Sequence, residues 1–98
     1  MPFITDIHAT VLAAATATNY SLNMGDWHTC ETTHCRAGWV VFLAGKEGLA
    51  LEKETSTLFA AMQIYKVSSD IKVPPARFFE NNEQGLADMN RCADLEGK

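Results

Sequence analysis

The sequence predicts an all-α protein: a small single-domain helical bundle of four main helices and one short helix, spanning residues 1–98. Three observations lead to this class. Apolar residues recur every three or four positions in several segments, residues that can cap helices precede those segments, and no segment has a clear strand pattern. The apolar fraction of 47% is typical of a globular chain, and 98 residues can enclose one hydrophobic core.

The N-terminal part predicts one amphipathic helix over residues 3–18, with Asn19 as its end. Its alanine-rich run favours helix, and His8 is expected on a solvated stripe. Residues 19–31 lack a helical period and predict a loop, within which a short extended pairing stays open.

The next segment predicts a central helix over residues 35–44, capped by Thr32 or Thr33 and ended by Gly45. Because this segment is apolar almost all round, we expect it to be buried by the other helices. Residues 46–54 predict a further helical turn or two.

A third main helix is expected after Thr55 or Ser56, either of which can cap it, and residues 68–70 break it. Residues 71–73 precede two prolines and must be extended, because proline excludes the helical conformation from the residue before it. Pro75 suits the first position of a short helix.

The last main helix begins at a capping box, with Asn81 as the cap and Gln84 three residues later, and Gly97 ends it. Its inward face is expected to carry four apolar residues: Leu86, Met89, Ala93 and Leu95.

Charge and composition exclude several function classes. The net charge is −4, and the eight Lys and Arg residues form no basic run, which argues against direct nucleic-acid binding and against a polybasic membrane patch. No stretch approaches the ~20 apolar residues of a membrane span, and no secretory signal is visible. We therefore expect a cytoplasmic protein with reduced cysteines.

One short segment concentrates reactive side chains: His28, Cys30, His34 and Cys35, to which Cys92 adds a distant thiol. Zinc binds such nitrogen and sulfur donors, so a metal- or redox-sensing domain that uses Cys30, His34, Cys35 and Cys92 is one hypothesis. The spacing disfavours it, because His34 and Cys35 are adjacent and diverge by about 100° on a helix.

The same segment allows three other interpretations. Cys35 in a first helical turn is a candidate nucleophile with His28 or His34 as its base, but no third catalytic member is visible. A structural disulfide between Cys30 and Cys35 is the second. The interpretation that we favour is a packed joint, in which Cys35 and Trp39 enter the core where the central helix begins.

The segment from Cys30 to Trp39 fits the pattern C-x-T-x-x-C-x-A-G-W. It resembles a family of small uncharacterised phage and bacterial proteins, sometimes fused to pentapeptide repeats. The flanking residues 27–29 and 41–45 and the segments 78–83 and 86–89 extend the resemblance, which covers roughly residues 22 to 92. The resemblance implies no catalytic residue and no cofactor, and it suggests an accessory protein that modulates a host component.

We therefore expect a protein that is not an enzyme, uses no cofactor and acts by binding another protein, for example by inhibiting a host defence system. Five acidic residues against one Arg mark the C-terminal segment as the candidate interaction face: Glu80, Glu83, Asp88, Asp94 and Glu96. Such a face would suit a basic surface of a host complex, including a nucleic-acid-binding groove. A homodimer through the apolar central helix is a further expectation.

Overall fold

The computed structural model describes residues 3–16, 21–22, 24, 28–30 and 33–97, with the backbone alone at 21, 28–30 and 33. It confirms the all-α class, to which three very short strands are added. The elements in chain order are α1 (Ile7–Thr16), β1 (Ser21–Leu22), β2 (His28–Cys30), β3 (Thr33–His34), α2 (Arg36–Leu43), α3 (Gly45–Glu54), α4 (Thr57–Ser68), the 3₁₀ helix η1 (Pro75–Phe79) and α5 (Asn82–Glu96).

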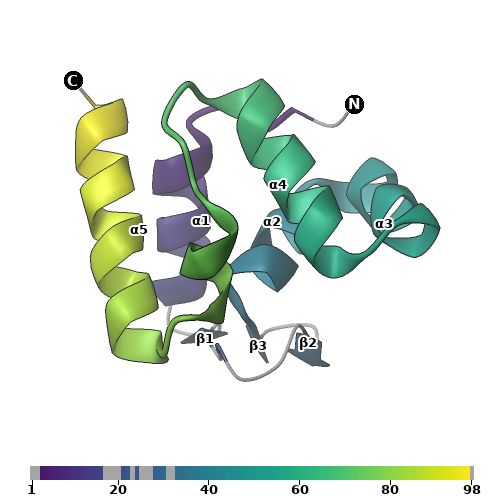
Figure 1. Ribbon diagram of the computed structural model, residues 1–98, viewed down its shortest axis with the longest axis horizontal. Coiled ribbons are helices and arrows are strands. Elements are labelled where there is room, and N and C mark those ends of the chain that lie inside the picture. The colour runs from purple at the N-terminus through teal and green to yellow at the C-terminus, as the bar shows by residue number, and fades with distance from the viewer. Residues whose placement is uncertain (1–2, 17–20, 23, 25–27, 31–32, 98) are drawn as a thin grey trace.

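The helices pack around α2. α1 lies beside α5, and α2 contacts α1 on one side and both α3 and α4 on the other (Figure 1). Residues 36–41 of α2 are all buried, which confirms the expected central helix. The core around it is apolar and includes Ile7, Val11, Trp39, Val40, Ile64, Phe78 and Met89.

The start of α2 differs from the sequence prediction. The cap is Cys35, whose Sγ accepts a hydrogen bond from the backbone N–H of Gly38 at 3.3 Å. Thr33 lies in β3 instead, so its prediction as the cap is wrong, and Thr32 falls outside the described residues. The pairing of Thr33 with β1 and β2 keeps its backbone extended, and α2 begins only at Arg36, so Thr33 lies two residues before the cap.

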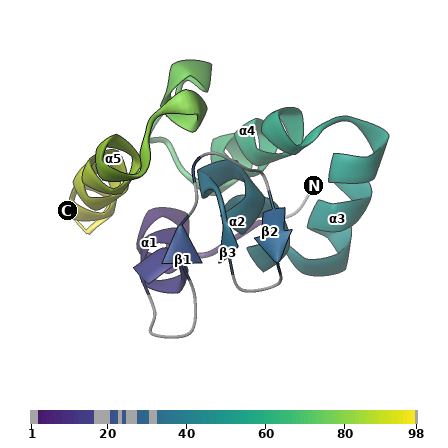
Figure 2. The ribbon, with the colours of Figure 1, turned by 90° about the horizontal axis from the view of Figure 1, so that it is seen from below.

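The three strands form one small sheet at one end of the molecule, in the order β1-β3-β2 (Figure 2). β3 pairs parallel with β1 and antiparallel with β2, with an irregularity between His28 and Cys30. β1 and β2 lie in the segment where the sequence left a short extended pairing open, but both pair with β3, which lies outside that segment. The sheet holds the chain that leads into α2.

α3 is longer than the expected turn or two, with ten residues. Gly45 has φ 69°, a left-handed conformation that ends α2 as predicted and turns the chain into α3. Gly48 is where α3 meets α2: a Cβ there would lie 2.5 Å from the carbonyl oxygen of Val41 and from Cβ of Ala44. Only glycine allows this approach.

The local signals of the C-terminal half are confirmed. Ser56 caps α4 with its Oγ on the N–H of Phe59, and Pro75 is the first residue of η1. Asn81 and Gln84 form the reciprocal capping box at the start of α5.

The first helix begins later than predicted, at Ile7 instead of residue 3, because Asp6 has φ 49°, outside the right-handed helical region. The predicted end at Asn19 lies outside the described residues. His8 was expected on a solvated stripe, and this is wrong: its side chain is 1% exposed and stacks on Tyr65 with ring centroids 5.1 Å apart.

The inward face of α5 is only partly as predicted. Met89 is buried, but Leu95 is 46% exposed. Asp88 and Cys92, which are one helical turn apart, are also buried, because this side of α5 faces α2 and α4.

Candidate functional site

The segment rich in Cys and His lies at the joint between the small sheet and α2. His34 is buried, and its ring packs against Trp39 at 4.6 Å and stacks on Phe42 at 4.8 Å between centroids. Cys35 is also buried, at the cap of α2. Both residues are thus part of the packing that begins the central helix, as the favoured interpretation expects.

The metal and thiol hypotheses involve side chains that the structure brings together only in part. Cys92 lies on α5, with its Sγ 3.7 Å from Nη2 of Arg36 and from Oδ2 of Asp88, and burial raises the pKa of its thiol. Among the described residues, no group of three or more His, Cys, Asp or Glu side chains is placed to hold a metal ion.

The side chains of His28 and Cys30 lie outside the described residues. The metal- or redox-sensing hypothesis, catalysis by Cys35 and the Cys30–Cys35 disulfide therefore stay predictions. Elemental analysis of the purified protein, together with melting curves with and without chelator or reductant, tests the first.

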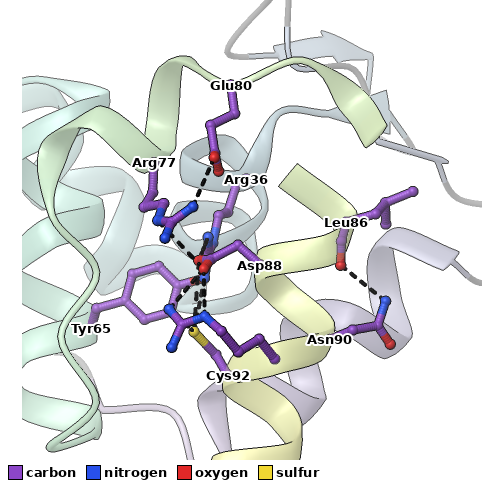
Figure 3. A network of polar contacts seen from close by, with 9 residues as sticks. Arg36, Tyr65, Arg77, Glu80, Leu86, Asp88, Asn90 and Cys92 are labelled. Carbon is purple, nitrogen blue, oxygen red and sulfur yellow. Dashed lines mark hydrogen bonds and ion pairs between the residues drawn. The ribbon is translucent and has the colours of Figure 1, made fainter. Parts of the chain in front are cut away.

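The most unusual feature of the core is a buried ion pair. Arg36 is 0% exposed at the start of α2, and its Nη1 donates to Oδ2 of Asp88 on α5 at 2.5 Å (Figure 3). Its Nε donates to the hydroxyl of Tyr65 on α4 at 3.1 Å. The guanidinium of Arg36 thus links α2 to α4 and to α5. Its partners, Tyr65 and Asp88, lie 29 and 52 positions later in the chain.

Asp88 receives two more arginines from the solvent side. Arg91 donates to its Oδ1 from Nε at 2.9 Å and from Nη2 at 2.7 Å, and Nε of Arg77 lies 3.4 Å from the same oxygen. Nη1 of Arg77 also donates to Oε2 of Glu80 at 3.0 Å (Figure 3). The network therefore runs from the core to the surface through one carboxylate.

Asp88 and Arg36 stay ionised near neutral pH. Burial by itself would raise the pKa of Asp88, but hydrogen bonds from Arg36 and Arg91 outweigh it, so its pKa lies below the usual value. Burial would likewise lower the pKa of Arg36, yet the neighbouring Tyr65 and Asp88 more than offset this. The pair stays ionised because the attraction between the two charges compensates for the water that each of them loses on burial.

Sequence reasoning missed Arg36 as a structural residue, although a signal was present. An arginine in the first turn of an otherwise apolar helix has to find a buried partner, because an unpaired charge in a core is too costly. Asp88 carried the matching signal, since it lies one turn before Cys92 on the same face of α5.

The five acidic residues predicted as an interaction face separate into two groups. Asp88 is 4% exposed and belongs to the core, so it cannot meet a partner. Glu80 is partly buried against Arg77, and Glu96 accepts hydrogen bonds from the backbone N–H groups of His8 and Ala9 at 2.9 and 3.0 Å. Glu96 therefore caps α1 from the neighbouring helix.

Two of the five carboxylates face solvent. Glu83 and Asp94 are exposed, and neither has a hydrogen bond or ion pair with the described residues. Ala87 and Asn90 are exposed between them. The four positions follow i, i+4, i+7 and i+11, which is one straight line along a helix. We call these four residues the acidic stripe of α5.

Comparison of the chain with protein-family models, with curated proteins and with solved structures finds no match. The resemblance of the Cys30–Trp39 segment to a phage and bacterial family thus remains an expectation from the sequence. Among the described residues, none of the helices has the length and apolar character needed to cross a membrane.

Proposed function

We propose that this protein acts by binding another protein through the acidic stripe of α5, with no catalytic step and no cofactor. The observation that carries the proposal is the pair of exposed carboxylates, Glu83 and Asp94, on one line of a firmly held helix. Their Cα atoms are about 16 Å apart, from eleven residues at 1.5 Å each.

The chemistry of the stripe favours a basic partner. The stripe holds two carboxylates and no Lys or Arg, and the small Ala87 at its middle lets a partner approach the helix closely. Two positive groups separated by a similar distance on a partner would pair with both ends at once. Such groups occur on surfaces that bind nucleic acids, so the stripe suits a mimic of a nucleic-acid backbone.

The stripe is preorganised. The capping box of Asn81 and Gln84 fixes the start of α5, the ion pair of Asp88 with Arg36 holds its middle, and Glu96 attaches its end to α1. A rigid binding face loses less entropy on association than a mobile one, and therefore binds more tightly for the same contacts.

The finer proposal follows from the resemblance of the Cys30–Trp39 segment. It is that the protein is a phage or mobile-element accessory protein and that the basic partner belongs to a host machine, for example a defence system, which it inhibits. Inhibition would follow directly if the stripe covers the partner's nucleic-acid-binding surface.

Self-association is a separate question. The expectation of a dimer came from the apolar central helix, yet α1, α3 and α4 cover α2 within one chain, and residues 36–41 are buried. A homodimer stays a prediction, and multi-angle light scattering across a range of protein concentrations tests it.

The experiment compares two double charge reversals of equal size. Glu83→Lys with Asp94→Lys changes the stripe, and Glu47→Lys with Glu54→Lys makes the same charge change on α3, where both residues are exposed and make no hydrogen bond or ion pair with the described residues. Circular dichroism first establishes that both variants are folded. Tagged wild type and variants then capture proteins from a lysate of the source cell, with quantitative mass spectrometry.

We expect one or a few proteins with basic surfaces to be enriched by the wild type and by the α3 variant. Capture by the stripe variant should fall at least about tenfold, and capture by the wild type should weaken as salt rises, because exposed charge pairs are screened. The proposal fails if the stripe variant captures the same proteins as the wild type, or if the two variants lose them equally.

A further inference from the structure

A groove lies between α4 and the chain that follows it. It encloses about 590 Å³ and is bounded by α4 on one side and by the connecting residues 69–75 on the other. Met62 and Tyr65 of α4 and Ile71, Val73 and Pro74 of the connection give it apolar walls. The connection crosses the molecule from the end of α4 to η1 (Figure 1). The acidic stripe does not line this groove, and of the polar network around Arg36 only Tyr65 does.

The connecting wall is extended at both ends and bends at Asp70 and Ile71 between them. Ser69 has φ −155° and ψ 151°, and Pro74 has φ −67° and ψ 156°. Ile71 and Val73 are half-buried, whereas Lys72 between them is exposed, which is the alternation of an edge strand. Pro74 and Pro75 follow directly. Pro74 keeps Val73 extended, because a proline disfavours the helical conformation at the residue before it.

The backbone of this wall has unused hydrogen-bonding groups. The N–H of Ile71 donates to Oγ of Ser69, but the N–H groups of Lys72 and Val73 donate to no group within the described part of the chain. In extended backbone, consecutive N–H groups point to opposite sides, so an extended peptide laid along one side can pair with one of the two, as at the edge of a sheet.

The charge at the groove is opposite to that of the protein as a whole. Lys66 from α4 and Lys72 from the connection are both exposed at its edge, and Asp70 is the single acidic residue that lines it among the described residues. The net charge of the chain is −4. A basic rim around an apolar floor selects a ligand with an apolar centre and negative ends.

We propose that the groove binds an extended peptide segment of a partner protein, with apolar side chains flanked by acidic residues. The peptide pairs its backbone with the N–H group of Lys72 or of Val73, places an apolar side chain against Met62 and Tyr65, and directs its acidic residues to Lys66 and Lys72. Backbone pairing supplies affinity, and the pocket with its two lysines supplies sequence preference.

A peptide fits these features better than a fatty acid does. A fatty acid would meet the apolar walls and one lysine, but it has no backbone to pair with the open N–H groups. The binding of a fatty acid would not depend on backbone hydrogen bonds. The experiment therefore compares peptides that differ only in their backbone N–H groups.

The experiment uses the ¹⁵N-labelled full chain and a blocked pentapeptide, acetyl-Asp-Val-Leu-Val-Asp-amide. We expect saturable shifts of the backbone amide resonances of Lys72 and Val73 and of the α4 residues that line the groove. Two peptides of the same sequence, N-methylated at alternate amides, each replace the N–H donors of one edge by methyl groups, which keep another strand from lying along that edge. At least one of them should bind about tenfold more weakly or worse, because the edge that pairs is blocked.

A matched pair of protein variants tests the charges. Lys66→Glu with Lys72→Glu should weaken the peptide by about tenfold, whereas Lys46→Glu with Lys53→Glu, an equal change at exposed sites of α3, should leave it unchanged. The proposal is overturned if no saturable shift appears at about 1 mM peptide, if both N-methylated peptides bind as well as the parent, if the two variants respond alike, or if dodecanoate produces the same shifts with the same affinity.

Discussion

Replacement of Asp88 by asparagine should destabilise this protein more than any surface change. The new side chain would keep the shape of the old one but lose its charge, so Arg36 would remain in the core without a counter-ion. Arg36 is 0% exposed and the Asp88 side chain 2% exposed, so water cannot take the place of the lost carboxylate. The added amide group would also face the donors of Arg91.

The expected cost follows from the burial of the pair. Removing one partner of a buried, hydrogen-bonded ion pair costs about 3–5 kcal/mol, whereas an exposed pair is worth up to about 1 kcal/mol. A 98-residue domain has a total stability of about 5–15 kcal/mol. Asp88→Asn should therefore remove about a fifth or more of the stability and lower the Tm by about 12 to 40 °C.

Urea denaturation followed by circular dichroism at about 222 nm measures the effect, because most of the described residues are helical. Asp94→Asn is the matched control, since it makes the same chemical change at an exposed position of the same helix. It should change the free energy of unfolding by no more than about 0.5 kcal/mol.

A second variant separates the lost ion pair from a general disturbance of α5. With Arg36→Met added to Asp88→Leu, no buried charge is left unpaired, because Arg77 and Arg91 are partly exposed, and the double variant should recover most of the stability that Asp88→Asn loses. If Asp88→Asn stays within about 1 kcal/mol of wild type, the buried pair is not the structural centre that the geometry indicates.

Three further predictions can be measured with the same urea titrations. Burial lowers the pKa of His8 below that of the unfolded chain, so the unfolded state binds the proton first and stability falls as pH drops below about 6.5; His8→Phe should reduce that fall between about pH 7 and 5. Glu96→Ala removes the carboxylate that caps α1 and should cost about 1 kcal/mol, and a neutral result would show that water replaces it. Gly48→Ala should cost about 1–3 kcal/mol because the new methyl group meets the carbonyl of Val41, while Gly97→Ala, with no atom closer than 3.6 Å, should cost nothing.

The local signals in the sequence predicted the helices of the C-terminal half well. Ser56, Pro75 and the Asn81–Gln84 box each act on backbone groups within three residues, so their effect is nearly independent of the rest of the fold. The apolar run of α2 likewise identified the central helix, because a segment that is apolar on all sides can only be covered by others.

The candidate interaction face was only partly predictable. The composition of residues 80–96 marked five carboxylates. However, Asp88 pairs with Arg36, 52 residues away in the sequence, and Glu96 caps α1 by accepting from the N–H of His8, 88 residues away. Which carboxylates remain for a partner depends on which helix faces α5, and a single sequence carries no record of that arrangement.

The same reason explains the errors at His8 and Thr33. His8 occupies a position that its own helix would allow to face solvent, and the neighbouring α4 buries it against Tyr65. Thr33 has the chemistry of a cap, but pairing with β1 and β2 takes its backbone.

Periodicity and capping are interactions between residues close in the chain, and they were enough to establish the class of fold and the positions of most helix ends. The arrangement of the helices in space decided which charged groups are buried, which carboxylates form the acidic stripe, and that residues 69–75 form the wall of a groove. These properties arise where distant segments meet, and there the cost of burying a charge or a backbone group is set by the partner that the fold supplies.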